Sequence, residues 1–162
     1  MRPEMTDRAA ALLDAYRDKG LKIATAESCT GGLVAALLTE ISGSSAVVER
    51  GFVTYSNEAK TELIGVSADL IASHGAVSEP VARAMAEGAL AHSRAQVAVA
   101  VTGVAGPTGG TATKPVGLVH FALARTGAAT IHLERRYGDL GRVNVRHRAL
   151  EDALSLLEQA VR

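Results

Sequence analysis

Residues 97–102 read VAVAVT, and the next eight residues, 103–110, read GVAGPTGG. An uncharged, largely apolar run of this length is typical of a strand covered on both faces, as in parallel α/β sheets. The Gly- and Thr-rich stretch from Gly103 to Pro115 predicts a long loop, and long loops in compact domains are often functional. The sequence therefore predicts a buried strand that leads directly into a glycine-rich turn.

The rest of the chain alternates between helical and strand patterns. Apolar residues at helical spacing predict helices over residues 5–19, 30–41, 57–64, 67–73, 78–93 and 140–162. Runs of β-forming residues predict strands over 21–26, 47–55, 117–124 and 130–137, the last two as a hairpin. In the last helix, the residues expected to face the core are Val143, Leu150, Leu154 and Leu157. This order predicts an α/β fold, a three-layer α/β/α sandwich with a mixed parallel/antiparallel sheet.

Length and composition limit the classes of protein to which the chain can belong. Its 162 residues, without a linker or repeat, predict one domain over residues 1–162. Lys and Arg together number 17, as do Asp and Glu, so there is no basic excess to attract nucleic acid. The stretch 97–106 is too short to span a bilayer, residues 1–17 do not resemble a signal peptide, and the single cysteine suits a reducing compartment. We expect a cytoplasmic protein with no nucleic-acid or membrane partner.

A second glycine-rich turn, TAESCTGG at residues 25–32, follows the first predicted strand. It places the hydroxyl of Ser28 just before a predicted helix, where unpaired backbone N–H groups can stabilise an oxyanion. The alternative is that Ser28 or Thr30 only caps the helix and the glycines allow close packing. The turn is not the Gly-x-Ser-x-Gly elbow of the α/β-hydrolases.

A serine nucleophile needs a base to take its proton. None of the five histidines lies in a catalytic motif, and no His, Cys, Asp or Glu cluster has metal-ligand spacing. Lys60 is the other candidate, because burial favours a neutral amine. It ends the stretch YSNEAK at residues 55–60, in which Tyr55 closes a strand and Asn57 is expected to cap a short helix. Lys60 can equally be a solvated helix residue.

The turn at residues 102–110, TGVAGPTGG, allows a ligand to approach the backbone closely. It lacks both the Walker spacing and the Gly-x-Gly-x-x-Gly spacing, so neither a nucleoside triphosphate nor a dinucleotide is indicated. An ordinary flexible loop is the alternative.

Four motifs occur together in a specific order: TAESCTGG, then Tyr-x-Asn-x-x-Lys, then TGVAGPxGG, then Lys-Pro-Val-Gly at residues 114–117. In these motifs the chain resembles the C-terminal domain of the CinA (competence/damage-inducible) proteins. The resemblance runs from about Thr6 to Val161. The length of the chain matches the stand-alone form of that domain, the bacterial nicotinamide-nucleotide amidohydrolases (PncC-like).

The resemblance implies hydrolysis of nicotinamide mononucleotide (NMN) to nicotinate mononucleotide and ammonia. It implies no cofactor and no metal, a homo-oligomer, and a catalytic set of Ser28, Tyr55 and Lys60. Which of Tyr55 and Lys60 is the immediate base stays open. The residues that it assigns to substrate binding are Thr30, Gly31, Asn57, Thr102, Gly103, Gly106, Arg142 and Arg146.

Arg142 and Arg146 are four residues apart, so they share one face near the start of the last predicted helix. Guanidinium groups beside a helix N-terminus suit a phosphate. We expect Arg142, which matches a family position, to be the phosphate ligand, with Arg146 as the weaker candidate. Two ordinary surface arginines are the alternative.

Three other interpretations follow from the same residues. Cys29, beside Ser28, is a possible nucleophile if its thiolate is stabilised. The domain can also be a catalytically silent module that binds a nucleotide or a partner protein, although the presence of Ser28, Tyr55 and Lys60 argues against this. Finally, an amidase of the same mechanism can act on a different carboxamide.

Overall fold

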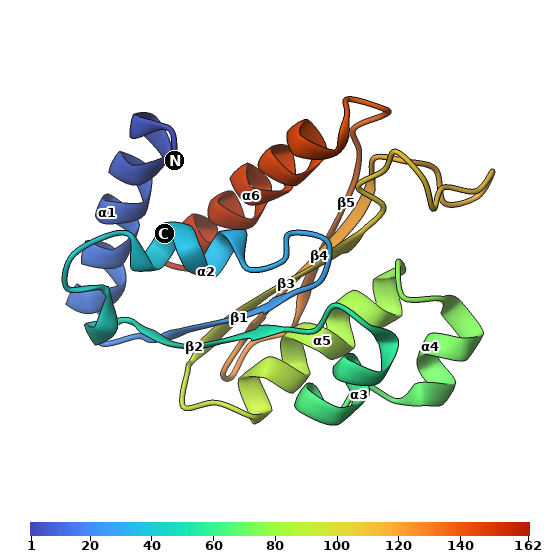
Figure 1. The fold of residues 1–162 in the computed structure, drawn as a ribbon. Coiled ribbons are helices and arrows are strands. Elements are labelled where there is room, and N and C mark those ends of the chain that lie inside the picture. Colours follow the sequence, from blue (N-terminus) through green and yellow to red (C-terminus); the bar gives the residue numbers. More distant parts are fainter.

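The computed structural model describes residues 1–162, with helices on both sides of a five-stranded sheet (Figure 1). The elements are, in chain order, α1 (Pro3–Asp18), β1 (Ile23–Glu27), α2 (Leu33–Thr39), the 3₁₀ turn Ser44–Ala46, β2 (Val48–Val53), α3 (Asn57–Ile64), α4 (Ala68–His74), α5 (Glu79–Ala91), β3 (Val97–Gly103), β4 (Leu118–Arg125), β5 (Ile131–Arg136) and α6 (Arg142–Gln159). This confirms the predicted α/β fold with a mixed sheet.

The strand order is β2-β1-β3-β4-β5. Strand β1 pairs in parallel with β2 and β3, whereas β4 is antiparallel to both β3 and β5. The hairpin predicted near the C-terminus is therefore present as β4 and β5.

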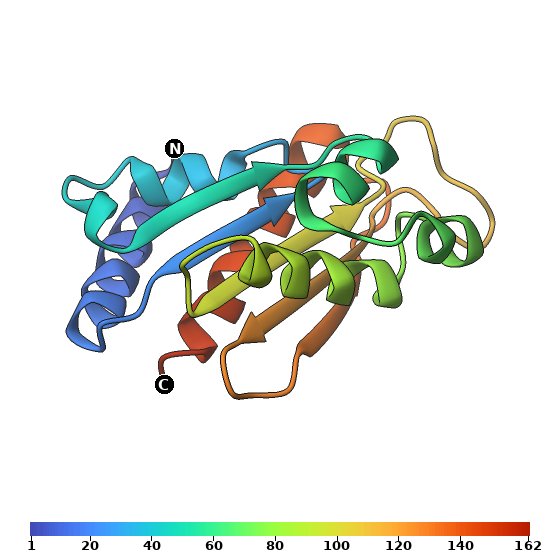
Figure 2. The same cartoon turned by 90° about the horizontal axis from the view of Figure 1, so that it is seen from below.

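The alternating valines and alanines of β3 explain why helices cover both faces of the sheet. Val97, Val99 and Val101 belong to a buried cluster of 26 residues with α1, α2 and α6. Ala98 and Ala100 belong to a second buried cluster, of 15 residues, with α3, α4 and α5. Small alanines allow α5 to pack closely on its face, while the larger valines fill the wider space beneath α6. Figure 2 shows α5 lying along the strands.

Three local predictions are wrong. The helix predicted over 30–41 begins only at Leu33, because Gly31 and Gly32 have left-handed φ values of 58° and 107°. Ser56, not Asn57, caps α3, since the Ser56 hydroxyl accepts the N–H of Ala59. Val143 is 63% exposed rather than in the core, because it lies in the first turn of α6 on the outward face.

The carboxyl ends of the three parallel strands meet at one edge of the sheet. The connection after β1 runs through α2 on one face, and the connection from β2 to β3 runs through α3, α4 and α5 on the other (Figure 1). Such a switch point opens a crevice outside the strand ends, where α/β proteins bind ligands. No helix of the chain is long and apolar enough to cross a membrane.

Candidate active site

A pocket of about 220 Å³ lies at this edge of the sheet. The loop after β1, the loop after β2, the end of β3 and the start of α6 all contribute to it. Its lining residues are Ser28, Cys29, Tyr55, Asn57, Lys60, Ala76, Val77, Thr102, Gly103, Ala105 and Arg142. Residues far apart in the sequence therefore meet at the switch point.

Ser28 and Lys60 are in direct contact in this pocket. The Nζ atom of Lys60 lies 3.0 Å from Ser28 Oγ and donates to the carbonyl of Thr54 at 2.8 Å. Longer contacts, each 3.4 Å, reach the carbonyls of Tyr55 and Ser56. The end of the Lys60 side chain is thus fixed by backbone groups, and its amine faces the serine hydroxyl.

Lys60 is fully buried, which is unusual for a lysine without an acidic partner. Removal from water disfavours the charged amine, so burial lowers the pKa of Lys60 below the ordinary value of lysine. A smaller coulombic effect of the Cys29 thiol acts in the opposite direction. A lysine of this kind reaches its neutral, proton-accepting form at a lower pH than a solvated one.

Tyr55 lies at the mouth of the pocket and not between the other two groups. The residue is 60% exposed, and its hydroxyl accepts a hydrogen bond of 3.0 Å from Arg142 Nη2. Only the backbone carbonyl of Tyr55 approaches Lys60. The geometry therefore favours Lys60, rather than the phenol of Tyr55, as the group that can receive the Ser28 proton directly.

The turn that carries Ser28 differs from the expected strand–helix junction. The carboxylate of Glu27, only 1% exposed, accepts the N–H groups of Val34 at 2.9 Å and Ala35 at 3.1 Å. The first turn of α2 is thus capped by Glu27 and does not offer these amides to a substrate. The free donors are instead in the turn itself, where the N–H groups of Cys29 and Thr30 find no acceptor in another residue.

Two predicted substrate-binding residues of this turn lie outside the pocket lining. Thr30 is fully buried, and its hydroxyl has no hydrogen-bond partner. Gly31 faces the guanidinium of Arg146, since a Cβ added there would lie 3.4 Å from Arg146 Nη2. Arg146 itself donates to the carbonyls of Cys29 and Thr30, each at 3.2 Å, and does not line the pocket either.

The opposite wall contains the other predicted contacts. Thr102 and Gly103 line the pocket, but the Thr102 hydroxyl donates to the carbonyl of Ala76 at 2.9 Å and so holds the segment before α5. Gly106 contributes its carbonyl, which accepts Arg142 Nη1 at 2.9 Å. Asn57 lines the pocket from the first turn of α3. Arg142 spans the mouth, joining Gly106 to Tyr55.

Cys29 is a poor alternative nucleophile in this environment. It is 7% exposed and packs in the larger core cluster. Burial raises the pKa of the Cys29 thiol to about 12, so the thiolate is scarce at neutral pH.

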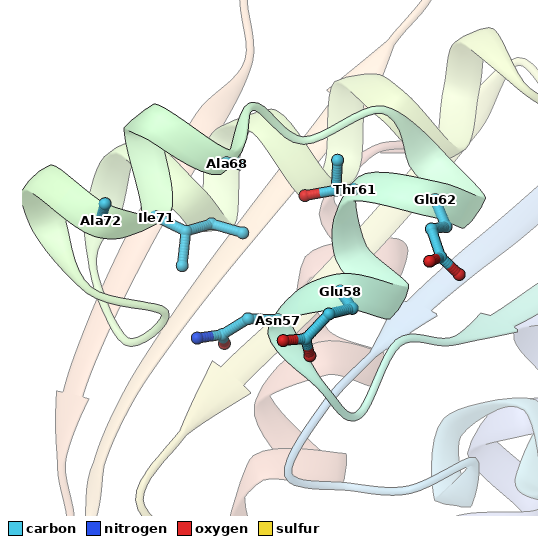
Figure 3. Close-up of a pocket in the computed structure, with 7 residues that line it drawn as sticks. All are labelled: Asn57, Glu58, Thr61, Glu62, Ala68, Ile71 and Ala72. Carbon is cyan, nitrogen blue, oxygen red and sulfur yellow. The ribbon is translucent and has the colours of Figure 1, made fainter.

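Two other features lie apart from this chemistry. His120 Nδ1 and His132 Nε2 form a contact of 2.9 Å on β4 and β5, and neither histidine lines the pocket. A larger groove of about 360 Å³ separates α3 from α4 (Figure 3). It shares Asn57 with the pocket, but its other polar side chains are those of Glu58, Thr61 and Glu62, and neither Ser28 nor Lys60 lines it.

Sequence reasoning missed Glu27, Ala76 and Val77. Glu27 was detectable in principle, because a carboxylate ends an otherwise uncharged strand directly before a glycine-rich turn. Ala76 and Val77 carry no chemical signal, and only the path of the chain between α4 and α5 brings them to the pocket.

Comparison with known proteins agrees with this architecture. The family model described as the CinA C-terminal domain matches residues 5–161. A CinA-like protein of Mycolicibacterium vanbaalenii is 56% identical over 142 residues, which cover 88% of this chain and 33% of that protein. A CinA-like protein of Mycolicibacterium gilvum is 54% identical over 156 residues, which cover 96% of this chain and 35% of that protein. The chain spans about a third of the length of the curated relatives it matches.

Solved structures match over almost their whole length. The competence/damage inducible protein CihA from Agrobacterium tumefaciens has a TM-score of 0.96 and 50% identity, covering 99% of this chain and 97% of that one. A CinA superfamily protein from Escherichia coli has a TM-score of 0.91 and 32% identity, and the match covers 99% of this chain and 93% of that one. By the match of the family model and by these identities, the chain belongs to the CinA C-terminal domain family.

Proposed function

We propose that this chain is a nicotinamide-nucleotide amidohydrolase, which converts NMN and water into nicotinate mononucleotide and ammonia. The observation that carries the proposal is the 3.0 Å contact between Ser28 Oγ and the amine of the buried Lys60. A serine hydroxyl paired with a lysine of lowered pKa is an arrangement for attack on an amide or ester carbonyl.

In the first half of the reaction, neutral Lys60 accepts the Ser28 proton while Oγ forms a bond to the carboxamide carbon. The two remaining N–H groups of the neutral amine can donate to backbone carbonyls such as that of Thr54. The N–H group of Cys29, which has no protein acceptor and belongs to a residue that lines the pocket, is the donor of the turn that can meet the developing oxyanion. The C–N bond then breaks, and Lys60 returns its proton to the leaving nitrogen, which departs as ammonia.

In the second half, water attacks the resulting ester of Ser28. Lys60 takes a proton from this water, and the bond between the acyl carbon and Oγ breaks. Lys60 returns the proton to Ser28, and nicotinate mononucleotide leaves as the carboxylic acid, which then loses its proton to water or to the released ammonia. No cofactor is consumed, and each proton that Lys60 accepts is given back.

Arg142 is the phosphate ligand in this proposal. Its guanidinium lines the pocket and uses two of its N–H groups on Gly106 and Tyr55, which leaves others for an anion. It is also the first residue of α6, and the N–H groups of residues 142–144 have no protein acceptor. A guanidinium and an 18-residue helix N-terminus together favour a phosphate at this end of the pocket.

The test is ammonia release by the purified protein from NMN, nicotinamide riboside, nicotinamide and glutamine. We expect the highest kcat/KM with NMN, and we expect Arg142→Met to reduce the preference for NMN over the riboside. Release from glutamine but not NMN would identify an amidase for another carboxamide. Binding of a nucleotide without any ammonia release would identify a silent binding domain instead.

A further inference from the structure

We infer that Arg146 is a positioning residue that fixes the peptide between Cys29 and Thr30, and thereby holds Ser28 and the free N–H of Cys29 in place at the wall of the pocket. The inference rests on the proposed amidohydrolase function and replaces the expectation that Arg146 binds the phosphate. It assigns the two arginines of α6 to different tasks.

The contacts of Arg146 are directed at the backbone of the Ser28 turn. Its Nε atom donates to the Cys29 carbonyl and its Nη2 atom to the Thr30 carbonyl, both at 3.2 Å. No Asp or Glu forms a salt bridge with it. Its half-buried charge is thus directed to two neighbouring peptide groups.

Gly31 gives the turn its shape beside Arg146. The guanidinium lies beside Gly31, and a Cβ there would be 3.4 Å from Nη2, a distance of van der Waals contact. The φ of +58° at Gly31 is a conformation that residues other than glycine rarely adopt. The glycine therefore serves the shape of the turn whose carbonyls Arg146 binds.

The geometry of a trans peptide explains how this contact affects catalysis. The carbonyl and the N–H of one peptide unit lie in one plane and point in opposite directions. Arg146 binds the carbonyl of the Cys29–Thr30 peptide, whose N–H belongs to Thr30 and has no protein acceptor. A charged donor on this oxygen fixes the orientation of that peptide and, with it, of the preceding Ser28–Cys29 peptide, whose N–H belongs to Cys29 at the pocket wall.

The peptide between Ser28 and Cys29 is also held through its carbonyl oxygen. The Ser28 carbonyl accepts the N–H of Gly31 at 3.0 Å, and the N–H of the same Ser28–Cys29 peptide is free. The turn therefore has two carbonyls held by protein groups and two adjacent N–H groups without a protein acceptor, and the first of these belongs to Cys29, which lines the pocket. Arg146 supplies the contact that the backbone alone does not provide for the second peptide.

The experiment compares Arg146→Met and Arg146→Lys with Arg142→Met and with the exposed control Arg148→Met, using NMN and nicotinamide riboside. We expect Arg146→Met to lower kcat about 10- to 100-fold for both substrates, because loss of an oxyanion donor outright costs about 10²- to 10³-fold. KM should change less than about threefold, methylguanidinium should restore part of kcat, and Arg146→Lys should retain more activity than Arg146→Met. Arg142→Met should instead raise KM for NMN.

A second measurement does not need an amide substrate. The rate at which a fluorophosphonate labels Ser28, followed by mass spectrometry, should fall in Arg146→Met and stay unchanged in Arg148→Met, with thermal melts to show that each variant is folded. An Arg146→Met variant that raises KM for NMN alone, at normal kcat and labelling rate, overturns the inference in favour of a phosphate ligand. A wild-type protein that releases no ammonia but shows the labelling difference contradicts the proposed function and not the role of Arg146.

Discussion

The chemistry of single residues in the pocket depends on whether Lys60 carries a proton. Protonated, it donates to Ser28 and to backbone carbonyls. Neutral, it can accept the serine proton. Its complete burial and the absence of an acidic partner shift this balance toward the neutral form. The sequence motif identified Lys60 as a candidate, but only packing distinguishes a buried base from a solvated helix residue.

Lys60 should therefore determine the acid limb of the pH–rate profile. Because burial lowers the pKa of Lys60, kcat/KM should rise with pH to a midpoint below the usual lysine value and then level. Lys60→Met should remove that limb and lower kcat/KM by about 10²- to 10⁴-fold, the usual contribution of a general base. Lys60→Arg should be equally inactive, since a guanidinium remains protonated. A Lys60→Met variant with an unchanged acid limb would assign the titration to another group.

At the scale of elements, the junction of β1 with α2 determines where Ser28 lies. Alternation and helical spacing predicted a strand, a turn and a helix here, with boundaries wrong by one to three residues. They did not predict that Glu27 would cap α2, because a cap seven residues away depends on the fold of the turn. The same limit applies to Arg146, whose partners lie 116 and 117 residues away.

Glu27→Gln should destabilise the protein. The carboxylate accepts two backbone N–H groups, whereas an amide has one oxygen and would place its NH₂ group against the other N–H. Hydrogen bonds to a charged group contribute about 1.5–3 kcal/mol, so we expect a loss of that order in the free energy of unfolding. Urea unfolding measures it, with the exposed Glu62→Gln as the matched control. Equal stability of the two variants would show that the cap contributes nothing.

At the scale of the whole molecule, the site exists because the sheet and both helical layers meet at one edge. The sequence predicted the elements and the mixed sheet. The strand order was not accessible, because β1 lies between β2 and β3 through pairings distant in the sequence. Arg142 and Tyr55, 87 residues apart, meet only through that order. The homo-oligomer implied by family resemblance stays a prediction.

Close packing between α5 and α3 links the fold to the position of Lys60. A Cβ at Gly88 of α5 would lie 2.0 Å from the carbonyl oxygen of Ile64, at the end of α3. In an isolated helix, replacing glycine by alanine stabilises the helix by about 1 kcal/mol. A loss of protein stability in Gly88→Ala would therefore come from the clash with Ile64. We expect Gly88→Ala to lower the free energy of unfolding by about 1–3 kcal/mol and to reduce kcat by moving α3. A stabilised, fully active variant would contradict this packing.

The most direct test of the proposed chemistry is ammonia release from NMN by Ser28→Ala beside Cys29→Ala. Serine as the nucleophile predicts that Ser28→Ala loses at least about 10⁴-fold in kcat, as in other serine hydrolases, and still binds NMN. Cys29→Ala should retain kcat within about tenfold, because its thiol stays protonated in the core. An active Ser28→Ala together with an inactive Cys29→Ala would contradict Ser28 as the nucleophile.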